Sequence, residues 1–246
     1  LDKKDLRIVN DARIRRIVPT VRELVGKRAK VVMLAHQSRK GGWDFIPLEQ
    51  HAELLSKHLG MPVEYVDDVI GDKAVEAIKA LKPGSVLLLG NVREIDSETA
   101  KGDMMKHSEG EIVKTLAPLI DYYVCDAFGA AHRSQCSLVG FEPKVPSASG
   151  RLMAKEIYAL NAIFGHPRRP SVFILGGAKF GDVSEMIDRV LGSGMADTVI
   201  LVGLVGNAYL LARGVDIGEA SMNVLKDELT PENLQAAKDI LSKYGQ

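Results

Sequence analysis

Short, continuous apolar runs along the chain alternate with longer segments in which apolar residues recur every three or four positions. The run at 30–35 (KVVMLA) is typical of a parallel strand that is covered on both faces. The segment at 48–59 carries Leu48, Ala52, Leu55 and Leu59 on one helical face. Such alternation of buried strands and amphipathic helices predicts an α/β fold, with a parallel sheet and helices on both of its faces.

The same pattern recurs to the end of the chain. Strands are predicted at 30–35, 63–66, 86–89, 122–125, 172–175 and 198–202. Helices are predicted from Asp11 to about 24, at 48–59, 72–81, 111–119 and 152–164, around 186–191, from 203 onward and at 231–244. We expect Asp11 to cap the first helix and Pro19 to kink or restart it.

Some stretches break the pattern. Residues 1–10 resemble a frayed lead-in, and 94–110 is polar without clear periodicity, so we expect a long loop there. The stretch 141–150 (FEPKVPSASG) contains two prolines and small polar residues, which is typical of a domain boundary. The sequence therefore predicts one unit before this stretch and a second one after it.

Arginines and histidines follow three of the predicted strands. They are His36 and Arg39 after the first strand, Arg93 after the third, and His132 and Arg133 in the segment DAFGAAHR that begins at Asp126. The carboxyl ends of parallel strands meet at one edge of a sheet, where ligands bind, and Arg13 near the start of the first helix could join them. A focused basic patch on a neutral protein suits an anionic small substrate, because guanidinium groups offer paired donors. The alternative is that these arginines are solvated surface and that 126–133 is only a helix cap with an ion pair.

A glycine turn follows the predicted strand at 172–175, in the segment GGAK at 176–179. Backbone N–H groups of such a turn can hold a phosphate, and Lys179 would add a positive charge. Two glycines after a strand also occur in ordinary tight turns, so this motif leaves both interpretations open. The chain contains none of the patterns GxxxxGK[ST], GxGxxG, HExxH or the EF-hand loop.

Composition narrows the class of protein. The 246 residues include 32 basic and 32 acidic side chains, which argues against a nucleic-acid binder with a broad basic surface. The hydrophobic share of 46% fits a globular protein with a core. Cys125 and Cys136 fit neither a disulfide framework nor a CxxC metal site, and they suggest a reducing, cytoplasmic setting. The polar start does not have the pattern of a signal peptide, and no run is long enough to span a membrane.

Several stretches together resemble the phosphoglycerate kinase family, and most of all its archaeal branch. The resemblance extends over nearly the whole chain, with the motifs in the order and spacing of the family. The matching stretches are 11–20 (DARIRRIVPT), 35–39 (AHQSR), 65–68 (YVDD), 88–93 (LLGNVR), 126–134 (DAFGAAHRS), 146–150 (PSASG) and 176–179 (GGAK).

The resemblance implies a Rossmann-like, three-layer front lobe at 1–150 that binds 3-phosphoglycerate. It further implies a connecting hinge helix at 151–170 and part of a second α/β lobe at 171–246 that binds a nucleotide. The implied reaction is reversible phosphoryl transfer between ATP and the carboxylate of 3-phosphoglycerate, with Mg²⁺ carried by ATP or ADP and no metal held by protein side chains. The implied substrate ligands are Arg13, His36, Gln37, Ser38, Arg39, Arg93 and Arg133, and the implied nucleotide ligands are Gly176, Gly177 and Lys179. Arg13 and Lys179 would also stabilise the phosphoryl group during transfer, which fits a reaction that needs positioning and positive charge.

This chain departs from the family pattern at four points. It starts after the strand that carries the family's Asp-x-Asn motif, and it stops before the second glycine-rich nucleotide loop. Val183 stands where the family commonly has a second lysine, and Gly90 stands where it usually has an acid. We therefore expect a chain that is trimmed at both ends and that does not turn over by itself.

Three hypotheses follow from the sequence. In the first, the chain is part of an enzyme of phosphoryl transfer. In the second, it is a catalytically inactive, anion-binding fragment of that family. In the third, its arginines are purely surface residues. Only the first two predict binding of 3-phosphoglycerate, with neither a nucleic acid nor a membrane as partner. The sequence carries no signal for an oligomeric state.

Overall fold

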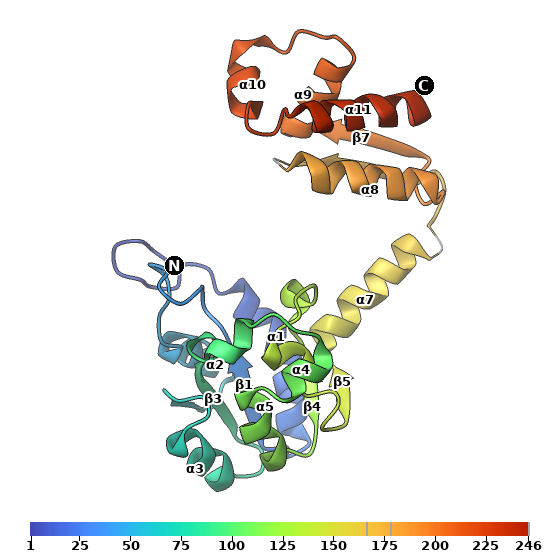
Figure 1. Ribbon diagram of the computed structural model, residues 1–246. Helices are drawn as coiled ribbons and strands as arrows, with labels where there is room; N and C mark the ends of the chain where they lie inside the picture. The colour runs from blue at the N-terminus through green and yellow to red at the C-terminus, as the bar shows by residue number, and fades with distance from the viewer. Residues whose placement is uncertain (166, 178, 246) are drawn as a thin grey trace. The chain divides into compact units, whose positions relative to one another are not determined.

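Residue contacts divide the chain into two compact units, Leu1–Ile157 and Tyr158–Gln246. The computed structural model (Figure 1) describes residues 1–165, 167–177 and 179–245. Each unit has its own sheet and core. The predicted division into functional lobes, at 1–150, 151–170 and 171–246, stays a prediction.

The first unit contains a parallel sheet of three strands in the order β1-β3-β2. The strands are β1 (Val31–Ala35), β2 (Val63–Val66) and β3 (Val86–Asn91). Val31 and Val63 both pair with Val86, so the three strands begin in register and end at one edge. All three strands were predicted, and β3 extends two residues further than predicted.

Helices cover both faces of this sheet, as predicted. They are α1 (Ala12–Gly26), α2 (Glu49–Leu59), α3 (Asp72–Ala80) and α5 (Glu111–Leu116). Successive side chains of a strand point to opposite faces. Leu87 and Leu89 accordingly pack in one cluster with apolar residues of α3 and α5, whereas Val86 and Leu88 pack in clusters with residues of α1 and α2. The α/β class with three layers is therefore confirmed for this unit.

Pro19 lies inside α1 and does not restart the helix, and the predicted kink stays a prediction. Two other predictions for the first unit were wrong. Asp11 stands at the N-cap, but its side chain does not cap the helix and instead pairs with His58 and Arg15. The segment 94–110 is not a long loop, because it contains the 3₁₀ turn Asp96–Thr99 and helix α4 (Met104–Ser108).

The fourth predicted strand does not join the three-stranded sheet. Strand β4 (Tyr123–Cys125) pairs in parallel with β5 (Ser147–Ser149), in the stretch that was predicted to be a boundary. The short helix α6 (Cys136–Val139) lies between them in sequence, and its Cys136 is fully buried in the largest cluster. Tyr123 stacks on Phe141 with ring centroids 5.0 Å apart, which ties this strand pair to the same core.

The second unit is built on the parallel pair β6 (Val172–Gly176) and β7 (Thr198–Val202). Helix α7 (Arg151–Phe164) leads into this unit from the first one. The other helices are α8 (Phe180–Gly192), α9 (Gly203–Ala212), α10 (Gly218–Leu225) and α11 (Pro231–Tyr244), of which α10 was not predicted. Leu175, Val199 and Leu201 pack with residues of α8, α9 and α11, while Ile174 and Ile200 on the other face are exposed. Across the described ranges, every helix is too short or too polar to cross a membrane.

Candidate anion site and nucleotide loop

His36 is influenced by three arginines from separate parts of the chain: α1, the 3₁₀ turn after β3 and the segment after β4. It follows β1 directly, and the positive charges of Arg93, Arg133 and Arg13 all act on its ring. Desolvation by the surrounding protein and these charges together lower the pKa of His36 to about 4. The structure therefore brings together residues that the sequence places far apart, and it leaves His36 neutral near pH 7.

Arg93 is held by the loop after β1. Its guanidinium donates a hydrogen bond to the Ser38 carbonyl oxygen, and its backbone N–H donates to Asn91 Oδ1 at 3.2 Å. Asn91 Nδ2 in turn donates to the Gln37 carbonyl oxygen at 2.9 Å. Burial and the positive charge of Arg133 lower the pKa of Arg93. The backbone oxygens of Ser38 and, through Asn91, of Gln37 therefore help to position Arg93, and the predicted role of Gln37 as a substrate ligand stays a prediction.

Ser38 itself adopts an unusual backbone conformation. Its φ of 59° lies in the left-handed region that residues other than glycine rarely adopt. Its hydroxyl donates a hydrogen bond to Asp44 Oδ1, which ties the turn together. The side chain of Ser38 is thus engaged with Asp44, and its predicted role as a direct substrate ligand stays a prediction.

A hollow of about 890 Å³ opens beside this cluster. Its lining residues are Arg39, Lys40, Arg93, Asp96, Thr99, Ala100, His132, Arg133 and Gln135. Arg39, Arg93 and Arg133 were predicted, whereas Arg13, His36, Gln37 and Ser38 are not part of this lining. Lys40 Nζ donates to Asp96 Oδ1 at 2.9 Å, so the rim contains one neutralised pair. The other basic residues give the hollow a positive character, which favours an anion.

Sequence reasoning missed the lining residues between Asp96 and Ala100, and with them the buried Glu98. The Glu98 carboxylate accepts hydrogen bonds from the Ser137 backbone N–H and hydroxyl, both at 2.8 Å. Burial raises the pKa of Glu98, although the Ser137 hydrogen bonds and the charge of Arg93 oppose this. Glu98 links the turn beside Arg93 to the start of α6. The only signal in the sequence was a polar stretch directly after Arg93.

The residues of the segment 126–133 do not all face the hollow. Arg133 lines the hollow, and its Nε donates to His132 Nε2 at 3.4 Å. Asp126 points elsewhere, because its carboxylate accepts hydrogen bonds from Thr20 Oγ1 and from the backbone N–H of Met153. The alternative of a helix cap thus holds for Asp126, while Arg133 remains available to a ligand.

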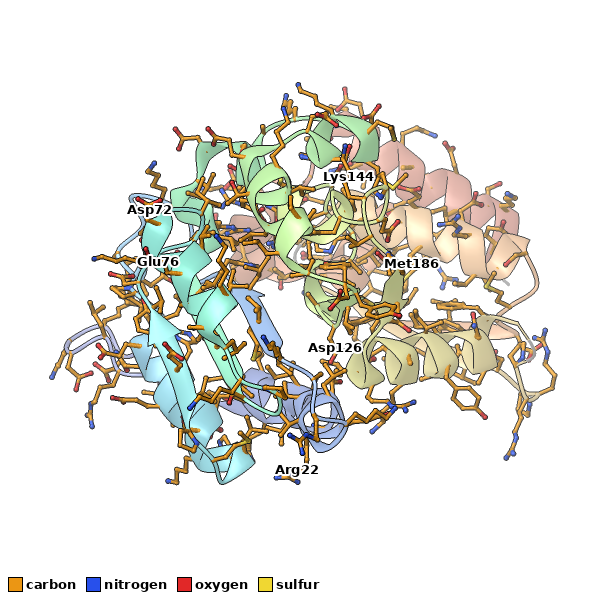
Figure 2. All side chains as sticks on the ribbon, turned by 90° about the horizontal axis from the view of Figure 1, so that it is seen from below. Arg22, Asp72, Glu76, Asp126, Lys144 and Met186 are labelled. Atoms are coloured by element: carbon orange, nitrogen blue, oxygen red, sulfur yellow. The ribbon has the colours of Figure 1, made fainter. Side chains whose placement is uncertain are left out.

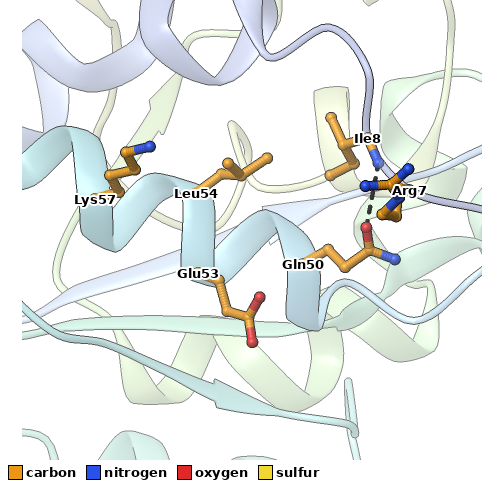
Figure 3. Close-up of a pocket in the computed structure, with 6 residues that line it drawn as sticks. All are labelled: Arg7, Ile8, Gln50, Glu53, Leu54 and Lys57. Carbon is orange, nitrogen blue, oxygen red and sulfur yellow. Dashed lines mark hydrogen bonds between the residues drawn. The ribbon is translucent and has the colours of Figure 1, made fainter.

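A second hollow, of about 320 Å³, lies where the lead-in crosses α2 (Figure 3). Gln50 accepts a hydrogen bond from the Ile8 backbone N–H at 3.2 Å and donates one to the Leu6 carbonyl oxygen at 3.2 Å. These bonds fasten residues 6–8 to α2, so the prediction of a frayed lead-in was wrong there. Arg7, Glu53 and Lys57 line this hollow with mixed charges, and none of the predicted site residues reaches it.

The glycine turn of the second unit connects β6 to α8. Gly177 has a φ of 151°, which L side chains rarely adopt, and Lys179 is exposed at the N-cap of α8. Ala178 of this motif lies outside the described residues. The Phe180 backbone N–H donates to Glu228 Oε2 at 3.2 Å, so a carboxylate already lies at the start of α8. A helix start that binds a carboxylate can also bind a phosphate.

Two departures from the family pattern have local explanations. A Cβ atom on Gly90 would lie 3.1–3.4 Å from backbone atoms of Asp68, whose carbonyl oxygen accepts from the Gly90 N–H at 2.9 Å. A larger residue would therefore have to displace that backbone. Val183 is partly buried and packs against the core of the second unit, where a charged side chain would be costly.

The fold and the hollow together define an α/β protein that has a basic, strand-end candidate anion site in its first unit. The family model for phosphoglycerate kinase matches residues 1–246, and the chain belongs to the phosphoglycerate kinase family. The phosphoglycerate kinase of Methanothermus fervidus is 43% identical over 240 residues, which cover 98% of this chain and 58% of the relative. That of Sulfurisphaera tokodaii is 41% identical over 241 residues, with coverages of 98% and 58%.

Solved structures agree with this assignment. The crystal structure of phosphoglycerate kinase from Pyrococcus horikoshii matches with a TM-score of 0.93 and 39% identity, over 98% of this chain and 60% of that one. The structure of phosphoglycerate kinase from Coxiella burnetii matches with a TM-score of 0.77 and 30% identity, over 98% and 57%. The chain thus spans about 58% of the length of the curated relatives it matches.

Proposed function

We propose that this chain carries the substrate-binding part and some of the nucleotide-binding part of a phosphoglycerate kinase. The reaction is reversible phosphoryl transfer between ATP and the carboxylate of 3-phosphoglycerate. The observation that carries this proposal is that Arg39, Arg93 and Arg133 line one hollow, beside His36, on which the charges of Arg93, Arg133 and Arg13 act. Three guanidinium groups supply the paired donors that a phosphate and a carboxylate require.

The proposed roles follow from position. Arg93, Arg133 and Arg39 line the hollow and bind the two anionic groups of 3-phosphoglycerate, with His36 and Arg13 beside them. The Ser38 carbonyl oxygen accepts from the Arg93 guanidinium, and the Gln37 carbonyl oxygen accepts from Asn91, whose Oδ1 accepts from the Arg93 backbone N–H. Arg13 and Lys179 stabilise the charge of the phosphoryl group in transfer, because such reactions depend on electrostatic positioning.

The glycine turn at Gly176 and Gly177, followed by Lys179, is the proposed phosphate-binding element for ATP or ADP. Its positive φ and its position before α8 suit a phosphate. Mg²⁺ would come with the nucleotide and would neutralise charge on its phosphates. The free thiols Cys125 and Cys136 favour a reducing compartment, so we place the protein in the cytoplasm.

A second candidate function is an anion-binding fragment without turnover. It is favoured by the coverage, since the chain spans 58% of its relatives. A coupled ATP assay on the chain extended at both ends to the length of its relatives distinguishes the two, because only the first candidate predicts that the extended chain forms ADP from ATP and 3-phosphoglycerate.

Isothermal calorimetry with 3-phosphoglycerate tests the anion site itself. Arg133→Ala removes a charge-assisted contact and should weaken binding by about 1.5–3 kcal/mol, or roughly 10- to 150-fold in Kd. Arg22→Ala is the matched control, because Arg22 is an α1 arginine that lines neither hollow and donates to the His58 carbonyl oxygen. Absence of heat with the unmodified chain, or equal losses in both variants, would contradict the proposal.

A further inference from the structure

A buried acid lies behind the hollow that Arg93 lines. The 3₁₀ turn Asp96–Thr99 contributes Asp96 and Thr99 to the lining, whereas Glu98 of the same turn has no exposed surface. The turn therefore presents two side chains to the hollow and one to the core. A buried carboxylate is costly unless hydrogen bonds and positive charges compensate it, so the surroundings of Glu98 need a physical explanation.

Glu98 joins two walls of the hollow from behind. Its carboxylate accepts hydrogen bonds from the backbone N–H and the hydroxyl of Ser137, both at 2.8 Å. Ser137 follows Gln135 by two positions, and Gln135 lines the hollow together with Arg133. The turn after Arg93 and the segment that carries Arg133 are therefore fastened to each other by a single carboxylate.

Glu98 also acts on Arg93 through its negative charge. Desolvation and the positive charge of Arg133 lower the pKa of Arg93, whereas the charge of Glu98 raises it. Burial raises the pKa of Glu98, and the charge of Arg93 opposes this. Within the described residues no hydrogen bond joins the two side chains, and Arg93 Nε is buried without a partner. The link between them is therefore electrostatic.

Two other acids near the hollow are engaged elsewhere. Asp126 lies at the start of α7 (Figure 2), where its carboxylate accepts from the Met153 N–H at 2.9 Å. Asp96 at the rim is paired with Lys40, and its side chain is 89% exposed, so water screens its charge. Glu98 thus supplies a negative charge at the back of the hollow that water does not screen.

We propose that Glu98 is a buried counter-charge that limits the affinity of the hollow for anions while it holds the two walls together. The proposal rests on the proposed function, because the anion in question is 3-phosphoglycerate. A fixed negative charge behind the arginines offsets the repulsion among their guanidinium groups, and it also repels the phosphate and the carboxylate of the ligand. The arginines therefore stay together in the free protein, and the ligand is bound weakly enough to be released.

Glu98→Gln tests the charge with the shape retained, because glutamine keeps an oxygen that can accept from the Ser137 N–H. Binding is measured by calorimetry on this chain at pH 8 and low salt, where screening is small. Between unit charges about 10 Å apart, the Coulomb energy changes a binding constant roughly twofold even at the dielectric constant of water. Glu98→Gln should therefore bind 3-phosphoglycerate, with three negative charges, about eightfold more tightly, and glycerol 3-phosphate, with two, about fourfold more tightly.

Two control variants separate charge from structure. Ser137→Ala removes one hydrogen bond and keeps the carboxylate, so it should change the affinities for both ligands by the same factor. Glu111→Gln removes an exposed acid beside the same turn, where Ser97 Oγ donates to Glu111 Oε2 at 3.5 Å. Water screens this exposed charge, so both affinities should change by less than about twofold.

Gain of affinity in Glu98→Gln that grows with the charge of the ligand would support the inference. Unchanged or weaker binding of 3-phosphoglycerate by this variant, or equal factors for the two ligands, would overturn the inference alone. Glu98→Asp keeps the charge and shortens the reach to Ser137, so the ratio of the two affinities should stay that of the unmodified chain; a changed ratio would also overturn the inference. Absence of binding by the unmodified chain would overturn the proposed function instead.

Discussion

The pKa of His36 reports two properties of the candidate anion site: how far the surrounding protein desolvates the imidazole, and how close Arg93, Arg133 and Arg13 lie to it. Its fall from the ordinary 6.5 to about 4 corresponds to about 3.4 kcal/mol, at roughly 1.36 kcal/mol per pH unit. The side chain is exposed, so solvent screens part of this, and we expect an effect on stability of about 1–2 kcal/mol. The unfolded chain binds a proton at His36 near pH 6.5 and the native state only near pH 4. The contribution of His36 to the free energy of unfolding therefore rises with pH between about 4 and 6.5, and it is lost as the pH falls through this window.

The perturbation is the removal of one positive charge at a time. The causes rank as desolvation, then Arg93, then Arg133, then Arg13. Arg93→Gln should therefore raise the pKa of His36 most, Arg133→Gln less, and Arg13→Gln least, while Arg22→Gln should leave it unchanged. Bound 3-phosphoglycerate should also raise this pKa, because its negative charge favours the protonated imidazole.

The assay is an NMR titration of the imidazole Cε1–H signals, in which His36→Gln identifies the signal of His36. The other histidines of the chain serve as internal references. A His36 that titrates near its ordinary value in the unmodified chain would refute the reasoning, since the arginines could then not surround it. The same conclusion would follow if Arg133→Gln and Arg22→Gln had equal effects.

Three further predictions concern stability. A buried carboxylate with a raised pKa makes the native state less stable as the pH rises above its ordinary pKa of 4.5. Glu98→Gln should therefore flatten the pH dependence of the free energy of unfolding in urea. An unchanged pH dependence in this variant would contradict a raised pKa of Glu98. Gly150→Ala should destabilise the first unit by about 1–3 kcal/mol through its collision with Asp126. Gly129→Ala, with nothing within 4 Å, is its control in the same thermal unfolding experiment, and equal midpoints would contradict the packing argument. Finally, 3-phosphoglycerate at about 100 times its Kd should stabilise the folded chain by about 2.7 kcal/mol in calorimetric scans, and unchanged unfolding would support solvated arginines instead.

The elements that were predicted correctly are those with strong local patterns. Strand β3 is an unbroken apolar run, and α2 has its apolar residues at helical spacing, so hydrophobic burial alone specifies both. The elements that were missed have weak patterns. Strand β5 consists of Ser-Ala-Ser, all exposed, and it forms only because β4 offers it backbone partners. Pro19 was expected to kink or restart α1, yet the helix continues through it, and the nearby Val18 and Val21 are buried.

The same distinction holds for the site. The α/β class, the arginines after three of the strands and the family could all be predicted from the sequence, because side-chain type and spacing are properties of the linear chain. Folding in three dimensions alone shows that Arg39, Arg93 and Arg133 line one hollow, that backbone oxygens of Gln37 and Ser38 accept hydrogen bonds from Asn91 and Arg93, and that Asp126 caps α7. These facts depend on distances between residues remote in sequence, and such distances arise only when the helices and strands pack into a common core.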